Sequence, residues 1–132
     1  MNIESIVCTF FDGKPNVYSV DLFGSYAQQR ATEKSDVDIA FLCDYAQLPT
    51  FFDLIDWREE LETLLHKKVD LVCLNEASPI LGMQVAKNRK NILLKNPRQY
   101  ANYQMKLFSS YAELKELRAP MEANILKRKY FS

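Results

Sequence analysis

The feature that most constrains this chain is a pair of aspartates at the start of an otherwise apolar run. Asp36 and Asp38 flank Val37 in the stretch DVDIAFLC, and a strand is predicted from Val37 to Cys43 because the run is short, apolar and bounded by polar residues. Side chains alternate along a strand, so the two aspartates share one face and the apolar residues take the other. One intervening residue is therefore the spacing that aims two carboxylates at one point.

Two carboxylates held side by side repel each other, and this repulsion costs stability unless a cation neutralises it. Hard oxygen ligands of this kind select Mg²⁺ or Mn²⁺. Asp70 lies near the start of another predicted strand, Val69 to Leu74, and would add a third carboxylate. Three carboxylates are enough to hold two metal ions for an in-line phosphoryl displacement, so the aspartates predict a two-metal centre.

Gly24 and Ser25 supply a second element of such a site. They follow a predicted strand, Val17 to Phe23, and Ser25 is expected to open a short helix. A glycine lets the backbone approach a ligand closely, and the amides of a helix N-terminus bind phosphate, with the Ser25 hydroxyl as a further donor. Arg30 and Lys34 in the following loop are candidates to reach a triphosphate, or else ordinary loop charges.

At this point a family resemblance becomes visible. Gly24-Ser25, ten intervening residues and Asp36-Val37-Asp38 resemble the signature of the DNA polymerase beta superfamily of nucleotidyltransferases, and a length of 132 residues is similar to its minimal nucleotidyltransferase group. The resemblance covers about residues 3–94. It implies an α/β (α+β) fold, in which a small mixed sheet is flanked by helices and is followed here by a C-terminal helical tail.

The resemblance also implies roles for individual residues. Gly24 and Ser25 would hold the nucleotide phosphates, for which the loop residue Arg30 is an additional candidate. Asp36 and Asp38 would hold two Mg²⁺ ions, and Asp70 in the stretch KKVDLVCL would hold one ion and the attacking hydroxyl. The substrate would be ATP, whose α-phosphate is attacked as pyrophosphate leaves.

The chain departs from the family pattern at Gln28 and Gln29, where an arginine and a glycine are usual. If the backbone turns with positive φ at Gln29, the side chain strains the turn or shifts it. The predicted metal ligands are intact, so the departure affects the loop geometry and not the ligand set.

Members of the minimal group are commonly antitoxins paired with a HEPN-domain ribonuclease toxin, and some add AMP to a tyrosine of that toxin. The resemblance therefore implies a protein adenylyltransferase that acts as an antitoxin, with a HEPN toxin and a nucleoside triphosphate as partners. Two alternatives stay open: a non-catalytic antitoxin that only covers its toxin, and a small-molecule nucleotidyltransferase of the aminoglycoside type. Direct nucleic-acid binding is not expected, and a homo- or hetero-oligomer is open.

Composition and charge fit one globular domain with a distinct tail. Hydrophobic residues make up 48% and charged residues 26% of the chain, and no apolar run is long enough to span a membrane, so we expect a cytoplasmic protein. Residues 1–96 carry 10 Lys and Arg against 14 Asp and Glu, and residues 97–132 carry 7 against 3. We therefore divide the chain into a nucleotidyltransferase domain, 1–96, and a basic helical extension, 97–132, which belongs to the same domain or docks a partner.

Apolar spacing predicts the remaining elements. An amphipathic helix is expected over residues 3–11, a capped helix from Ser78-Pro79 and an edge strand over 91–94. A helix beginning near Pro49 would bury the stripe Phe51, Leu54, Ile55, Trp57 or Arg58, Leu61, Leu64 and Leu65. A last helix from Pro97 is expected to break near Pro120.

Several other residues have a functional and a structural interpretation, and we favour the structural one. His66 fits a surface residue that stabilises a helix C-terminus. Tyr100, Tyr103 and Tyr111 lie at helical spacing and fit a packing stripe, although they are also candidates to stack on a base or receive a nucleotide. The basic run 127–129 fits a solvated terminus, and Cys8, Cys43 and Cys73 fit buried, reduced thiols.

Overall fold

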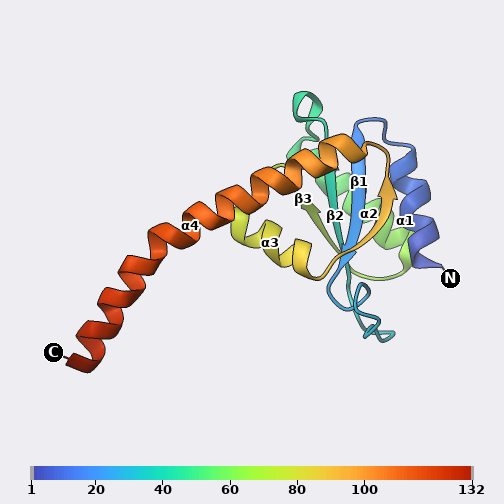
Figure 1. Cartoon of the computed structure of the whole chain (residues 1–132). Coiled ribbons are helices and arrows are strands. Elements are labelled where there is room, and N and C mark those ends of the chain that lie inside the picture. The colour runs from blue at the N-terminus through green and yellow to red at the C-terminus, as the bar shows by residue number, and fades with distance from the viewer. Residues whose placement is uncertain (1, 132) are drawn as a thin grey trace.

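A mixed four-stranded sheet forms the centre of the molecule (Figure 1). The computed structural model describes residues 2–131, and the side chains of residues 2–116. The strands are β1 (Val17–Phe23), β2 (Val37–Cys43), β3 (Val69–Cys73) and β4 (Lys90–Leu94), and their order in the sheet is β3-β2-β1-β4. β1 pairs antiparallel with β2 and β4, whereas β2 and β3 are parallel. The small mixed sheet predicted from the sequence is confirmed.

Helices cover both faces of this sheet. They are α1 (Ile3–Asp12), α2 (Phe51–Leu65), α3 (Pro79–Lys87) and α4 (Pro97–Phe131), with a short 3₁₀ turn at Tyr45–Gln47. α1 and α2 pack on one face, and α3 with the first turns of α4 on the other, from which the rest of α4 projects (Figure 1). Within residues 2–131, no helix is long and apolar enough to cross a membrane.

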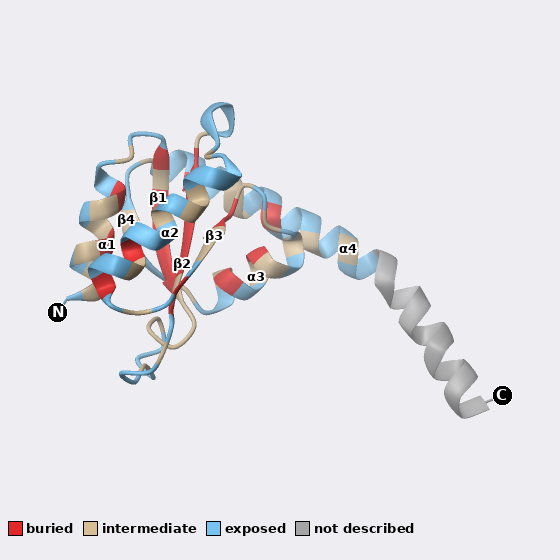
Figure 2. Ribbon diagram, turned by 180° about the vertical axis from the view of Figure 1, so that it is seen from behind, coloured by how far each residue is buried: buried red, intermediate tan, exposed pale blue. Residues whose placement is uncertain are grey.

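The alternation of strand side chains produces two apolar cores, and the buried residues of the chain are red in Figure 2. The larger core places Ile39 and Phe41 of β2 against Phe11 of α1 and Leu61 of α2. The smaller core places Ala40 and Leu42 of β2 beneath α3 and α4. β2 is therefore buried on both faces beyond its first residues, and its start is the place where its polar side chains can meet solvent.

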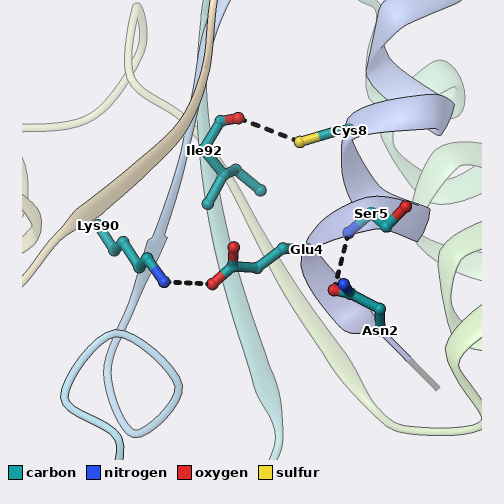
Figure 3. A network of polar contacts seen from close by, with 6 residues as sticks. All are labelled: Asn2, Glu4, Ser5, Cys8, Lys90 and Ile92. Atoms are coloured by element: carbon teal, nitrogen blue, oxygen red, sulfur yellow. Dashed lines mark hydrogen bonds and ion pairs between the residues drawn. The ribbon is translucent and has the colours of Figure 1, made fainter.

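The edge strand β4 is fastened to α1 along its length (Figure 3). Glu4 and Lys90 form an ion pair at 2.5 Å, and the Cys8 thiol donates to the Ile92 carbonyl at 3.1 Å. After the strand, the Lys95 ammonium donates to the Phe11 carbonyl at 3.1 Å. The start of α1 is itself capped by Asn2, whose side chain accepts from the amide of Ser5, the third residue of the helix.

A buried carboxylate joins α4 to β1. Asp21 is 1% exposed, accepts the Tyr100 hydroxyl at 2.8 and 2.9 Å, and accepts the Asn91 amide at 2.9 Å. Burial raises the pKa of Asp21, and these hydrogen bonds oppose that rise. Arg89 donates to the Tyr100 hydroxyl and lies over its ring at 4.9 Å. The sequence pattern identified Tyr100 as a packing residue, but it gave no sign of its charged partner.

Two predicted features of the helices are wrong. Phe51 and Leu64 were expected in the buried stripe of α2, but they are 72% and 48% exposed, because α2 meets the sheet mainly through Leu61 and Leu65. α4 does not break near Pro120 but continues to Phe131. A proline removes one helical hydrogen bond, and the good helix formers around it in the sequence keep the chain helical.

We predict that Tyr100→Phe lowers the free energy of unfolding by about 1–3 kcal/mol, because the buried Asp21 carboxylate loses a donor. Urea denaturation followed by circular dichroism measures this change. Tyr45→Phe is the matched control, since its ring is 59% exposed, and its effect should stay within about 0.5 kcal/mol. Equal stabilities for Tyr100→Phe and the native chain would contradict the role of this hydrogen bond.

Candidate active site

Two of the predicted aspartates lie side by side in the sheet. In the parallel pairing of β2 with β3, Asp38 is directly opposite Asp70. Their neighbours Ile39 and Leu71 contact the α1–α2 core, so by alternation both aspartates lie on the other face. Asp36 lies two residues before Asp38, just ahead of β2, and is exposed. The crossover through α2 thus brings together carboxylates that are more than thirty positions apart in the sequence.

Gly24 packs against one of these carboxylates. It follows β1 directly, and Phe23 at the end of β1 is opposite Asp38. Gly24 has φ +68°, and a Cβ atom placed on it would lie 2.2 Å from Asp38 Oδ2. Glycine is needed here for both its positive φ and its lack of a side chain. The glycine of the predicted phosphate-binding pair and the second predicted metal ligand are therefore in contact.

Ser25 does not open a helix as predicted. Residues 24–29 form one hydrogen-bonded turn, in which the Gln28 amide donates to the Gly24 carbonyl at 3.3 Å and the Arg30 amide to the Ser25 carbonyl at 2.9 Å. Gln29 ends the turn with φ +57°. A left-handed residue closes a helix after a single turn, so no further helical residues follow. The departure at Gln29 therefore leaves the turn in place, and its side chain is held in a conformation that favours glycine.

Side chains on both sides hold the loop that follows. The Gln28 side-chain amide donates to the Asn88 side chain at 2.7 Å, and Arg30 donates to the Gln28 side-chain oxygen. From the other side, the Lys67 ammonium donates to the Glu33 carbonyl at 2.7 Å. Asn88 and Lys67 were missed from the sequence, because each stands in a polar run that marks a helix end. The position of Lys67 in the run HKKVD, three residues before the predicted ligand Asp70, was the available signal.

Electrostatics at Asp38 reflect this crowding of acids. Burial raises the pKa of the Asp38 carboxyl, and the negative charges of Asp70 and Asp36 raise it further. A divalent cation relieves repulsion of this kind, and three carboxylates are the donor set that Mg²⁺ prefers, so these residues fit the predicted metal. Among the described residues, however, no group of three or more His, Cys, Asp or Glu side chains is already gathered as a metal site.

The residues given structural interpretations occupy structural positions. His66 is the exposed C-terminal cap of α2, in a left-handed conformation. Tyr100 is buried, and Tyr103 is half-buried against the smaller core. All three thiols are free, and Cys43 and Cys73 are buried as predicted, but the prediction that Cys8 is buried is wrong, because it is only half-buried. The basic run 127–129 lies outside the side chains that the structure describes.

A family model of the polymerase beta nucleotidyltransferases matches residues 6–98, which include the sheet and all three aspartates. The chain belongs to the polymerase beta nucleotidyltransferase family. Its mixed four-stranded sheet with helices on both faces is therefore a nucleotidyltransferase fold, as the sequence predicted.

Similar proteins within this family are named as protein adenylyltransferases or solved as toxin–antitoxin complexes. The protein adenylyltransferase MntA of Shewanella oneidensis is 33% identical over 94 residues, which are 70% of this chain and 65% of that protein. This chain spans 54–61% of the length of several other curated relatives. A toxin–antitoxin crystal structure with AMP-PNP matches 96% of this chain and 99% of its own, with TM-score 0.81 and 28% identity.

A second similar solved structure contains an AMPylated toxin. It contains a tri-AMPylated Shewanella oneidensis HEPN toxin in complex with its MNT antitoxin, and it matches 94% of this chain and 96% of its own. The TM-score is 0.76 and the identity 26%. Matches of this extent reach beyond residue 98, so the similarity to these nucleotidyltransferase structures includes much of α4.

We predict that Gly24→Ala lowers the free energy of unfolding by about 1–3 kcal/mol, because the new methyl group meets Asp38 and an alanine must hold a positive φ. Thermal or urea denaturation measures the loss. Gly13→Ala is the matched control: Gly13 has φ −76°, and its added Cβ would lie 3.5 Å from the nearest atom. If both variants lost the same stability, close contact between Gly24 and Asp38 would be refuted.

We predict that Gln29→Gly raises the free energy of unfolding by about 0.5–1 kcal/mol, because glycine adopts the left-handed conformation with less strain. The relief of this strain exceeds the stability lost through the greater entropy of the unfolded chain. Gln29→Ala keeps the Cβ atom and should bring no such gain. The same denaturation measurement compares the two variants. A gain in Gln29→Ala equal to that in Gln29→Gly would assign the effect to the side chain and not to the backbone.

Proposed function

We propose that this protein is an antitoxin that transfers AMP from ATP to the hydroxyl group of a tyrosine on a cognate HEPN ribonuclease toxin. The observation that carries the proposal is the contact between Gly24 and Asp38, with Asp70 directly opposite Asp38. A phosphate-binding turn and a carboxylate pair that lie in contact are suited to chemistry on a phosphate ester. Further support comes from the similar proteins, which are protein adenylyltransferases and antitoxins bound to toxins.

Each residue of the site has a proposed role. The backbone amides of the turn at Gly24 and Ser25 bind the triphosphate, and Arg30 adds a positive charge beside it. Asp36 and Asp38 would hold two Mg²⁺ ions, and Asp70 would share one of them. When bound, the ions would neutralise the charge that develops on the phosphate oxygens. Since Asp36 and Asp70 are exposed, their side chains are free to turn toward Asp38.

The reaction forms one bond and breaks another. The acceptor oxygen bonds to the α-phosphorus of ATP, the bond from that phosphorus to the bridging oxygen breaks, and pyrophosphate leaves. Asp70 would receive the hydroxyl proton, and its exposure beside Asp38 supports this role. Holding the reacting groups in position supplies much of the rate enhancement.

The chain is also proposed to act in two parts. Residues 1–96 carry the site, and the extension 97–132 supports it through the Tyr100–Asp21 contact while its projecting length remains for a partner. A cytoplasmic location follows from the proposed toxin, whose RNA substrates are intracellular.

One observation favours a second candidate. The described carboxylates are not gathered into a metal site, and this would suit an antitoxin that neutralises its toxin by binding alone. In that case, the aspartates would be dispensable. The two candidates differ in what happens when the carboxylates are removed and the partner is kept.

We predict that the protein transfers label from ATP labelled at the α-phosphate, in the presence of Mg²⁺, to the toxin encoded beside it. Asp36→Asn combined with Asp38→Asn should reduce the transfer at least about a hundredfold, because the phosphate charge is no longer neutralised. Removal of Mg²⁺ with a chelator should have the same effect on the native protein. Autoradiography and mass spectrometry of the toxin measure both.

Asp56→Asn combined with Glu59→Gln is the control, since both acids are exposed on α2. It should transfer label at the native rate. Absence of transfer by the native protein, together with toxin inhibition that survives in the Asp36→Asn, Asp38→Asn variant, would reject the enzyme and support the binding antitoxin.

A further inference from the structure

An open cavity of about 190 Å³ lies between α2 and β3. It is lined by Phe51, Leu54, Ile55, Arg58, Asp70 and Leu71. Sites that enclose a whole small-molecule ligand usually measure about 300–1,000 Å³, so this cavity is of a size for one side chain. Its walls are mostly apolar, with a single carboxylate and a single guanidinium.

The cavity adjoins the proposed reaction centre through Asp70. Asp70 is directly opposite Asp38 in the parallel pairing, and it is exposed. β3 is an outer strand of the sheet, and within the described part of the chain no strand pairs with its free edge. Leu71 faces α2 and Asp70 faces the other way, so a group that enters over Leu71 reaches Asp70 around this free edge.

An exposed aromatic pair includes one residue of the cavity wall. Phe51 and Phe52 are 72% and 74% exposed, and their rings are edge to face with centroids 5.9 Å apart. Phe51 lines the cavity and Phe52 does not. The helix stripe predicted Phe51 in the core, yet the residue faces solvent at the cavity. Exposed aromatic rings beside an apolar recess mark a place where another molecule binds.

We propose that this cavity is the acceptor pocket, and that it takes the phenol side chain of a tyrosine on the partner protein. The inference rests on the proposed transfer of AMP to a protein hydroxyl. The ring lies between Phe51, Leu54 and Leu71, and its hydroxyl reaches Asp70 at the sheet edge. The phenolic oxygen then bonds to the α-phosphorus of ATP, pyrophosphate departs with the bridging oxygen, and the phenolic proton passes to the Asp70 carboxylate.

The chemistry of the walls selects a tyrosine over other hydroxyls. A serine or threonine has too little apolar surface to fill a recess formed by Phe51, Leu54, Ile55 and Leu71. A tyrosine has an apolar ring and a polar tip, and the cavity has apolar walls and a polar end. Arg58, which supplies the one guanidinium of the cavity wall, pairs with Glu62 at 3.5 Å.

The test compares Phe51→Ala with Phe52→Ala. The two residues are adjacent in the first turn of α2, have the same side chain and are almost equally exposed, but only Phe51 lines the cavity. We expect Phe51→Ala to reduce kcat/KM for the toxin about tenfold or more, and Phe52→Ala to change it less than about threefold. ATP affinity, measured by isothermal titration calorimetry, should be unchanged in both variants.

Two further results bear directly on the pocket. Mass spectrometry of the toxin should find AMP on tyrosine, and AMP on serine or threonine would overturn the proposal. Equal losses of kcat/KM in the two variants, or no loss in either, would overturn it as well.

Failure of the proposed function is distinguishable from failure of the pocket. If the native protein transfers no label to the neighbouring toxin, the pocket is tested with N-acetyltyrosinamide as a probe in NMR titrations. Chemical-shift changes at Leu54, Ile55 and Leu71 that vanish in Phe51→Ala and persist in Phe52→Ala support the pocket. Changes elsewhere, or none at these residues, overturn it without reference to activity.

Discussion

The contact between a glycine backbone and a carboxylate is the constraint on which the rest of this structure depends. Gly24 approaches Asp38 so closely that any side chain at this position would displace the carboxylate. The contact requires β1 and β2 to pair in a register that places Phe23 opposite Asp38. The same register places the turn of residues 24–29 over the start of β2. The loop, the sheet and the acids are therefore fixed together, and a change in one alters the geometry of the others.

The site concentrates negative charge at the one end of β2 that remains accessible. Asp38 is partly desolvated and lies near two other acids, and its raised pKa records the cost of this arrangement. The rest of β2 lies within two apolar cores, whose burial offsets such a local cost. Proteins commonly keep unfavourable charge where function needs it and derive stability from surrounding packing. Asp21 on the same sheet is fully buried, and hydrogen bonds from Tyr100 and Asn91 satisfy it internally.

Much of the fold was predictable because its signals are local. The strands ending at Phe23 and Cys43 and the helix capped by Ser78 follow from apolar spacing, turns and caps, and each agrees with the structure. The single turn after Ser25 was not predictable as such, because it depends on Gln29 adopting a left-handed backbone. Likewise, the outward position of Phe51 depends on the angle at which α2 crosses the sheet, and a helical stripe does not encode that angle.

The aspartates of the site were predictable from the sequence, but the residues that hold the neighbouring loop were not. Spacing identified Asp36 and Asp38, and resemblance identified Asp70 as their partner on another strand. Asn88 and Lys67 hold the loop through contacts across 60 and 34 positions of sequence. Nothing in the neighbourhood of either residue specifies its distant partner, because such contacts exist only after the sheet has brought the loops together.

The two edge strands of the sheet, β3 and β4, differ in how well another strand can pair with them, and this difference limits how copies of this chain can associate. β4 contains a bulge at Ile92 and is fastened to α1, and both features make an edge a poor template for another strand. Within the described residues, the edge of β3 has neither a bulge nor a helix fastened along it. A sheet can continue through many molecules only if each molecule has two edges that can pair with a strand of another copy. With one competent edge, pairing between copies can close only a two-fold dimer, so the open edge of β3 carries little risk of fibre formation.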